Sequence, residues 1–139
     1  MISFNYETEF ALENETAYIE WIQSIIASEN KKEGEITFVF CDDAYLLEIN
    51  QKYLNHDYYT DIISFDYSVG NELNGDIFIS IPMVKENAET YEVTFANELL
   101  RVMAHGVLHY AGYKDKSEED SALMRAKEEE KMAMFHVEQ

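Results

Sequence analysis

The segment from residue 94 to residue 115 constrains the fold most, because it has the pattern of a helix that is apolar on nearly all sides. Almost every position between residues 99 and 111 is apolar. At about 3.6 residues per turn, the polar exceptions share one face: Glu98, Arg101, His105 and His109. Such a helix belongs in a core, where ionisable side chains are costly to bury unless they are paired or bind something. We therefore expect a buried helix whose polar stripe faces a partner.

The two histidines of this stripe are candidate metal ligands. His105 and His109 lie one turn apart, so both imidazoles can reach one ion. Gly112 is a natural residue to end the helix in a left-handed conformation, after which Asp115 can supply a third ligand. Two histidines, a carboxylate and an open position for water form the ligand set of a catalytic zinc site. The alternative is a pair of core histidines that bond to backbone carbonyls.

Gly106 weighs against peptide hydrolysis. Zinc peptidases with the pattern His-Glu-x-x-His use the residue after the first histidine as the general base, and that residue is Gly106 in this chain. A glycine inside a helix costs about 1 kcal/mol relative to alanine. We therefore expect Gly106 to allow the close approach of another backbone or of a substrate.

Length and composition fit one globular domain over residues 1–139, with 47% apolar and 14% aromatic residues. The only cysteine is Cys41, which excludes an internal disulfide and fits a reducing compartment. The N-terminal residues lack the pattern of a signal peptide, and no segment approaches the length of a membrane span. These features predict a soluble, cytoplasmic protein without a membrane partner.

The formal net charge of −18 is unfavourable for binding nucleic acid, because contacts of Lys and Arg with phosphates normally supply most of the affinity. The ten Lys and Arg residues can still act locally, because charges farther apart than about 8 Å are largely screened. A bound divalent cation would add positive charge at the site itself.

Hydrophobic periodicity and turn residues predict an alternation of strands and helices. The expected strands cover residues 2–6, 35–41, 58–67 and 75–81, and we expect the last two to pair as neighbours. The expected helices cover residues 14–28, 42–53, 82–90, 94–111 and 117–132. The acidic run at 128–130 in the last helix is interpreted as a solvated face.

Residues 105–115, with the sequence HGVLHYAGYKD, resemble the signature His-Gly-x-Leu-His-x-x-Gly-Tyr-Asp-His of the YbeY family of bacterial rRNA maturation factors, which are metal-dependent endoribonucleases. Residues 50–53 (NQKY), 60–65 (TDIISF) and 75–77 (GDI) resemble further blocks of this family in the same order. The resemblance implies an α+β, zincin-like fold: a mixed sheet of about four strands packed with helices, with the metal-site helix under a cleft. It also implies action on single-stranded RNA, in maturation of the 3′ end of small-subunit rRNA and in ribosome quality control.

The chain departs from the family pattern at three positions. Asp115 replaces the third histidine, Leu54 replaces an arginine expected to hold RNA, and Tyr59 replaces a proline. Asp115 can still bind a metal but makes the site more anionic. Arg101 is the candidate catalytic residue that takes over the phosphate contact; its alternative role is an ion pair with Glu98, three residues earlier.

The resulting hypothesis is an endoribonuclease with one Zn²⁺ per chain, held by His105, His109 and Asp115. The ion would polarise a phosphate oxygen and lower the pKa of its water, while Arg101 or Lys114 would offset charge in the transition state. No side chain stands out as a general base. The rival hypothesis is a non-catalytic ribosome-assembly factor with a structural zinc, which binds rRNA or basic proteins of the small subunit. A zinc hydrolase acting on peptides or small molecules is a third, which the glycine after the first histidine disfavours.

Overall fold

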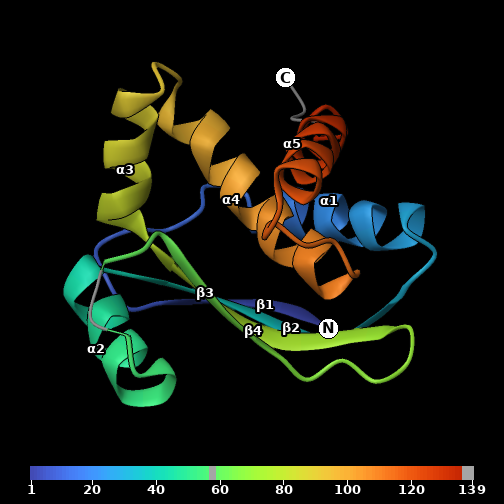
Figure 1. The fold of residues 1–139 in the computed structure, drawn as a ribbon, viewed down its shortest axis with the longest axis horizontal. Coiled ribbons are helices and arrows are strands. Elements are labelled where there is room, and N and C mark those ends of the chain that lie inside the picture. The colour runs from blue at the N-terminus through green and yellow to red at the C-terminus, as the bar shows by residue number, and fades with distance from the viewer. Residues whose placement is uncertain (57–58, 136–139) are drawn as a thin grey trace.

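A four-stranded mixed sheet lies at the centre of the fold in the computed structural model, which describes residues 1–56 and 59–135 (Figure 1). The elements follow one another as β1 (Ile2–Tyr6), α1 (Glu15–Ser28), β2 (Lys32–Cys41), α2 (Asp43–Leu54), β3 (Ile62–Asp66), β4 (Glu72–Ser80), α3 (Ile81–Thr90), α4 (Phe95–Tyr110) and α5 (Glu118–Met132). Helices α1, α3, α4 and α5 lie on one side of the sheet, and α2 lies on the other. Among the described residues, no helix has the length and apolar character to cross a bilayer.

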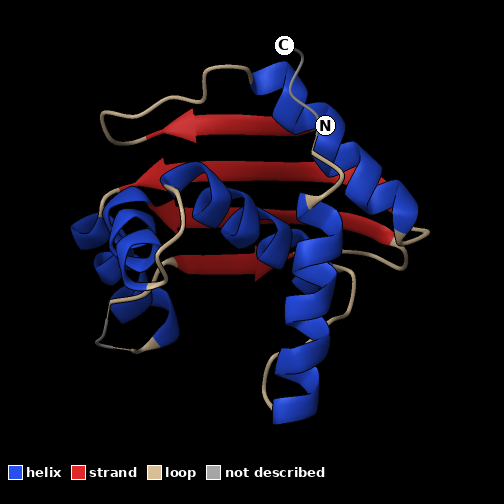
Figure 2. Ribbon diagram, turned by 90° about the horizontal axis from the view of Figure 1, so that it is seen from above, coloured by secondary structure: helices blue, strands red, loops and turns tan. Residues whose placement is uncertain are grey.

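The strands are arranged in the order β1-β2-β4-β3 (Figure 2). β1, β2 and β4 run parallel, with Ile2 paired to Ile36 and Phe38 paired to Ile77, whereas β3 runs antiparallel to β4. Parallel neighbours need a crossover connection, which α1 provides between β1 and β2. The sheet confirms the expected α+β class, the mixed sheet of four strands and the expected pairing of the last two strands.

The strand boundaries differ in places from those expected from the sequence. β2 begins at Lys32 rather than at residue 35, because Lys32 pairs with Glu72 at the start of β4. β3 is shorter than expected, and residue 58 of the expected range lies outside the described residues. The end of a strand depends on a partner that is distant in the sequence, and a local pattern does not contain that partner.

Alternate residues of the strands supply two separate apolar clusters, one on each face of the sheet. The main core joins the sheet to the buried side of α4, and its members include Ile36, Phe38, Phe40, Ile77, Ile79, Leu99, Val102, Met103 and Val107. On the opposite face, Cys41, Leu46 and Ile63 form a smaller cluster between the sheet and α2. Helix α4 is buried along most of its length, as its apolar pattern predicts, so the packing fixes the direction of its polar stripe.

Gly106 lets α4 approach the sheet closely. A Cβ atom at this position would lie 3.0 Å from Ile77 Cδ1 and 3.2 Å from Ile62 Cδ1, which is tighter than ordinary van der Waals contact. The expected close approach is therefore present, and the groups that approach Gly106 are two isoleucine side chains of the sheet rather than a backbone. The absence of a side chain at Gly106 thus lets α4 pack closely on β3 and β4.

Candidate metal centre

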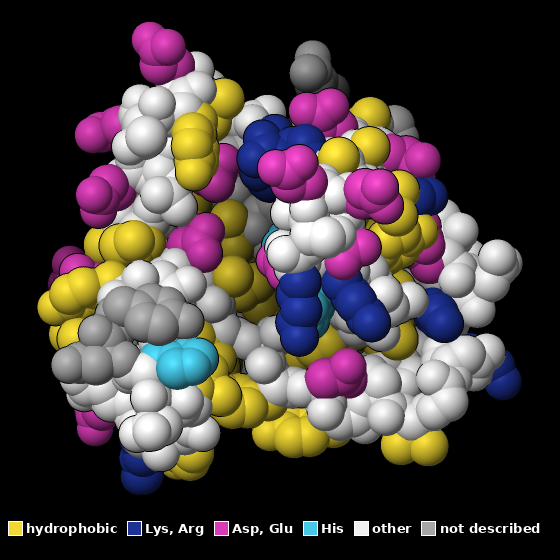
Figure 3. Space-filling view, in the orientation of Figure 1, with side chains coloured by type: hydrophobic (Ala, Val, Ile, Leu, Met, Phe, Trp, Pro, Cys, Tyr) yellow, Lys and Arg dark blue, Asp and Glu magenta, His cyan; other side chains and the backbone are white. Residues whose placement is uncertain are grey.

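A cleft of about 510 Å³ is formed by α3, α4, α5 and the segment that leads into β3 (Figure 3). Its polar lining includes Thr60, Asp61, Ser64, Asn87, Tyr91 and Arg125. All four site residues proposed from the sequence, Arg101, His105, His109 and Asp115, also line this cleft. The polar stripe of α4 therefore faces a hollow that a ligand can enter.

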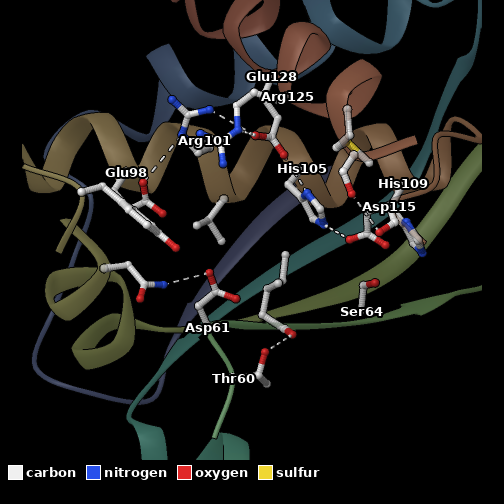
Figure 4. A pocket seen from close by; sticks show the side chains of 16 residues that line it. Thr60, Asp61, Ser64, Glu98, Arg101, His105, His109, Asp115, Arg125 and Glu128 are labelled. Carbon is white, nitrogen blue, oxygen red and sulfur yellow. Dashed lines mark hydrogen bonds and ion pairs between the residues drawn. The ribbon is translucent and has the colours of Figure 1, made fainter. Parts of the chain in front are cut away.

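His105 is held between two carboxylates. Its Nδ1 atom lies 2.7 Å from Glu128 Oε2, and its Nε2 atom lies 3.4 Å from Asp115 Oδ2. The His105 and His109 rings are nearly parallel, with an interplanar angle of 9° and centroids 6.3 Å apart. In Figure 4 the Asp115 carboxylate lies between the two rings. The structure thus brings the three proposed ligands to one end of the cleft.

The turn after α4 positions Asp115. Gly112 has a φ of +111°, and the N–H of Tyr113 donates to the Leu108 carbonyl at 3.1 Å. This Schellman geometry confirms the predicted left-handed end of the helix. The Ser121 hydroxyl on α5 donates to the Asp115 carbonyl at 3.1 Å, which ties the turn to the last helix.

The chemistry of the three proposed ligands fits a metal ion. Among residues 1–56 and 59–135, no group of three His, Cys, Asp or Glu side chains is already arranged to hold one, so the ligand set stays a prediction. Imidazole nitrogens and a carboxylate are zinc ligands, and a metal-binding histidine usually bonds to a carboxylate through its other ring nitrogen. Glu128 makes that bond to His105 Nδ1, which leaves Nε2 facing Asp115.

The surrounding carboxylates also change the proton affinity of His105. Burial lowers the pKa of His105, but the hydrogen bond with Glu128 and the charges of Glu128 and other nearby carboxylates outweigh burial, so its pKa is raised. An environment that favours a proton on this ring is electrostatically favourable for cations in general.

Glu128 belongs to the site, although the sequence indicated a solvated face for residues 128–130. Its side chain is buried, and it bonds to both His105 and Arg101 across the interface of α4 and α5. The solvated-face interpretation is wrong for this residue because α5 turns Met124 and Glu128, four residues apart, toward the protein interior. That spacing from an apolar residue was a sequence signal for the burial of Glu128, although not for its partners.

Arg101 is tied to two glutamates. Its Nη1 atom donates to Glu128 Oε1 at 3.2 Å, and its Nε atom lies 3.7 Å from Glu98 Oε1. The ion pair with Glu98, which was the alternative role for Arg101, is therefore present, and the pair with Glu128 is an addition. Arg101 also lines the cleft. Its contact with a phosphate stays a prediction. Lys114, the alternative cation, lines a neighbouring hollow with Tyr113.

Two further carboxylates, Glu98 and Asp61, line the cleft beside the proposed site residues. Burial raises the pKa of Glu98 and outweighs the lowering effect of the Arg101 charge. Burial also raises the pKa of Asp61, which accepts a hydrogen bond from Asn87 Nδ2 at 3.2 Å. Asp61 lies in the block at 60–65 that resembles the family pattern, and this was the sequence signal for it.

The fold and the cleft define an α+β protein whose candidate active site is lined by histidines and carboxylates. A family model described as Endoribonuclease YbeY matches residues 2–136, and the chain belongs to this family. It is 65% identical over 139 residues to Endoribonuclease YbeY of Flavobacterium psychrophilum, which covers 100% of this chain and 99% of the relative. It is 56% identical over 138 residues to Endoribonuclease YbeY of Christiangramia forsetii, with 99% of this chain and 96% of the relative covered.

A solved structure also resembles the chain. The solution structure of a Thermotoga maritima protein matches it with a TM-score of 0.70 at 24% identity, covering 97% of this chain and 89% of the other. At that identity the likeness shows the fold alone. Membership of the YbeY family confirms the family expected from the sequence and the endoribonuclease class of activity that came with it.

Replacing Glu128 with glutamine is expected to weaken metal binding and RNA cleavage by about 10- to 100-fold, the usual cost of losing a carboxylate that orients a metal ligand. The amide keeps the shape of the side chain but has no charge with which to hold His105 and Arg101. Zinc titration and a cleavage assay would measure the two effects. Glu129→Gln, at an exposed position, is the matched control. Equal zinc affinities and equal cleavage rates in the two variants would show that Glu128 contributes packing alone.

Proposed function

We propose that the chain is a metal-dependent endoribonuclease specific for single-stranded RNA, acting in the cytoplasm on the 3′ end of small-subunit rRNA and in ribosome quality control. The proposed cofactor is one Zn²⁺ per chain, held by His105, His109 and Asp115. The arrangement around His105 carries the proposal. Glu128 fixes Nδ1 of this ring, and Nε2 lies 3.4 Å from Asp115 Oδ2 in an open cleft.

The residues of the chain position the substrate in this proposal. A zinc ion bound there supplies Lewis acidity to a phosphodiester and lowers the pKa of a coordinated water molecule. Arg101, anchored by Glu128 at 3.2 Å, presents its other N–H groups to the phosphate and stabilises the charge that develops on it. In this proposal, a flexible single strand reaches the three ligands in the cleft lined by α3, α4 and α5 more readily than a rigid duplex does.

A non-catalytic ribosome-assembly factor with a structural zinc is the second candidate, and the net charge of −18 favours it. An acidic surface suits basic ribosomal proteins better than it suits RNA. The partner would then be the small ribosomal subunit, through its proteins or its rRNA. Ribosome maturation that is rescued in cells by a variant unable to cleave RNA would favour this candidate.

The purified chain is expected to cleave a labelled single-stranded RNA and to leave the same RNA intact in a duplex. EDTA should abolish cleavage, and Zn²⁺ added in excess over the chelator should restore it, because the three ligands need an ion to act on the phosphodiester. Gel electrophoresis of the products measures both effects. Cleavage that EDTA leaves unchanged would contradict metal dependence, and equal cleavage of the duplex would contradict the strand preference.

A further inference from the structure

The two walls of the cleft differ in chemistry. On the side of α3, Asp61, Tyr91 and Glu98 offer two carboxylates and an aromatic ring. On the side of α5, the lining includes the exposed cation Arg125 and the carboxylate of Glu128, which is already bonded to Arg101 and His105. A single RNA strand likewise has two different edges, a row of phosphates and a row of bases. The cleft can therefore favour one orientation of such a strand.

Tyr91 presents an exposed aromatic ring from a fixed backbone. It ends α3, and its N–H donates to the Asn87 carbonyl at 2.9 Å. The residue is 59% exposed and lines the cleft. Tyr67 is equally exposed, at 59%, but is not part of the cleft lining. An exposed tyrosine ring inside an RNA-binding cleft is suited to stacking, because every base has a flat aromatic face.

Arg125 lies on the opposite wall and has a largely available guanidinium. Its side chain is 62% exposed, and its Nε atom lies 4.0 Å from Glu128 Oε1, at the limit of an ion pair. A guanidinium in that setting can bond to a phosphate through two N–H groups. On the other wall, Glu98 is buried and paired with Arg101, so Asp61 is the carboxylate there that opposes phosphate. The exposed guanidinium of Arg125 therefore offers the phosphates a partner on the side of α5, and the ring of Tyr91 offers the bases a partner on the side of α3.

We propose that Tyr91 stacks on a base of bound single-stranded RNA while Arg125 contacts the phosphates of the same strand. This inference rests on the proposed function, since RNA must occupy the cleft. Stacking has a particular value in this chain, because a net charge of −18 weakens the electrostatic attraction on which RNA binding usually depends. Base stacking on an aromatic ring does not depend on that attraction.

The test combines protein variants with RNAs in which one base at a time is replaced by an abasic site. For the wild type, removal of the stacked base should raise KM by about 5- to 150-fold, the range of one base–aromatic stack. Tyr91→Ala should raise KM for intact RNA by a similar factor. For this variant, KM should not rise further when the RNA carries that abasic site. Tyr91→Trp should keep the wild-type KM, because it keeps an aromatic face. Tyr67→Ala, at the equally exposed position outside the cleft, is the matched control.

Arg125→Gln should behave differently from Tyr91→Ala. It should weaken binding of intact and abasic RNA by the same factor and reduce the slope of log affinity against log salt by about 1, because a phosphate contact is electrostatic and independent of the base. If each abasic site raises KM by the same factor in the wild type and in Tyr91→Ala, the stacking proposal is overturned and the proposed function stands. If the wild type cleaves no single-stranded RNA, both are overturned.

Discussion

The His109→Ala variant is expected to lose at least about 100-fold in RNA cleavage while keeping its fold. Loss of a carboxylate that only orients a ligand costs about 10- to 100-fold, so loss of a ligand itself should cost more. His109 is exposed on an otherwise buried helix, so its removal should change the free energy of unfolding by no more than about 0.5 kcal/mol. Product formation from labelled RNA and thermal melting followed by circular dichroism measure the two quantities.

The controls for this variant separate three explanations. His56→Ala is matched, because His56 is exposed in the loop after α2 and is not part of the cleft lining. A contaminating nuclease would cleave equally in every preparation, including His105→Ala. Cleavage lost in His105→Ala but intact in His109→Ala would contradict the assignment of His109. Loss of cleavage together with rescue of ribosome maturation in cells would show that catalysis is not the biological role.

The Lys131→Met variant is expected to lose about 3 kcal/mol in the free energy of unfolding at pH 7, as other proteins do when a buried ion pair is broken. Lys131 is 1% exposed, and its Nζ atom lies 2.8 Å from Glu29 Oε2 and 2.9 Å from Ser28 Oγ, where α1 meets α5. Methionine keeps most of the volume but removes the nearest cation from a carboxylate that is largely buried. Unfolding in urea measures the loss.

The pH dependence gives a second readout of the same pair. Burial raises the pKa of Glu29, but hydrogen bonds from Lys131 and Tyr113 outweigh burial, so the folded-state pKa is lowered. A carboxyl group with a lowered folded-state pKa stabilises the protein above its unfolded pKa, and this contribution is lost as the pH falls through the folded value. The difference in the free energy of unfolding between wild type and Lys131→Met should therefore be largest at pH 7 and should shrink below about pH 4.5.

The control for this prediction is Lys127→Met. Lys127 also pairs with Glu29, at 3.6 Å, but its side chain is 27% exposed, so its loss should matter much less. The double variant Glu29→Gln with Lys131→Met should recover part of the stability, because it leaves no unpaired buried charge. Equal stability of wild type and Lys131→Met, or a difference that is the same at pH 4 and pH 7, would contradict the ion-pair account.

The polar stripe of α4 and the turn at Gly112 were predictable from the sequence, because helical spacing and a C-terminal glycine act over a few residues. The role of Glu128 was not predictable from the sequence, because this role depends on how α5 packs on α4. Glu128 orients His105, which lies 23 positions earlier in the chain. The start of β2 at Lys32 depends on pairing with β4 in the same way. Gly106 was expected to allow a close approach, but only the packed sheet shows that isoleucine side chains make it.

The metal content of protein purified without a chelator tests the central claim most directly. We predict about one zinc ion per chain, by elemental mass spectrometry, in the wild type and in His56→Ala, as expected for a single three-ligand site. We predict a large loss of zinc in His105→Ala, His109→Ala and Asp115→Ala. Full zinc content in these three variants, or a wild-type protein that cleaves RNA without bound metal, would contradict the proposed centre.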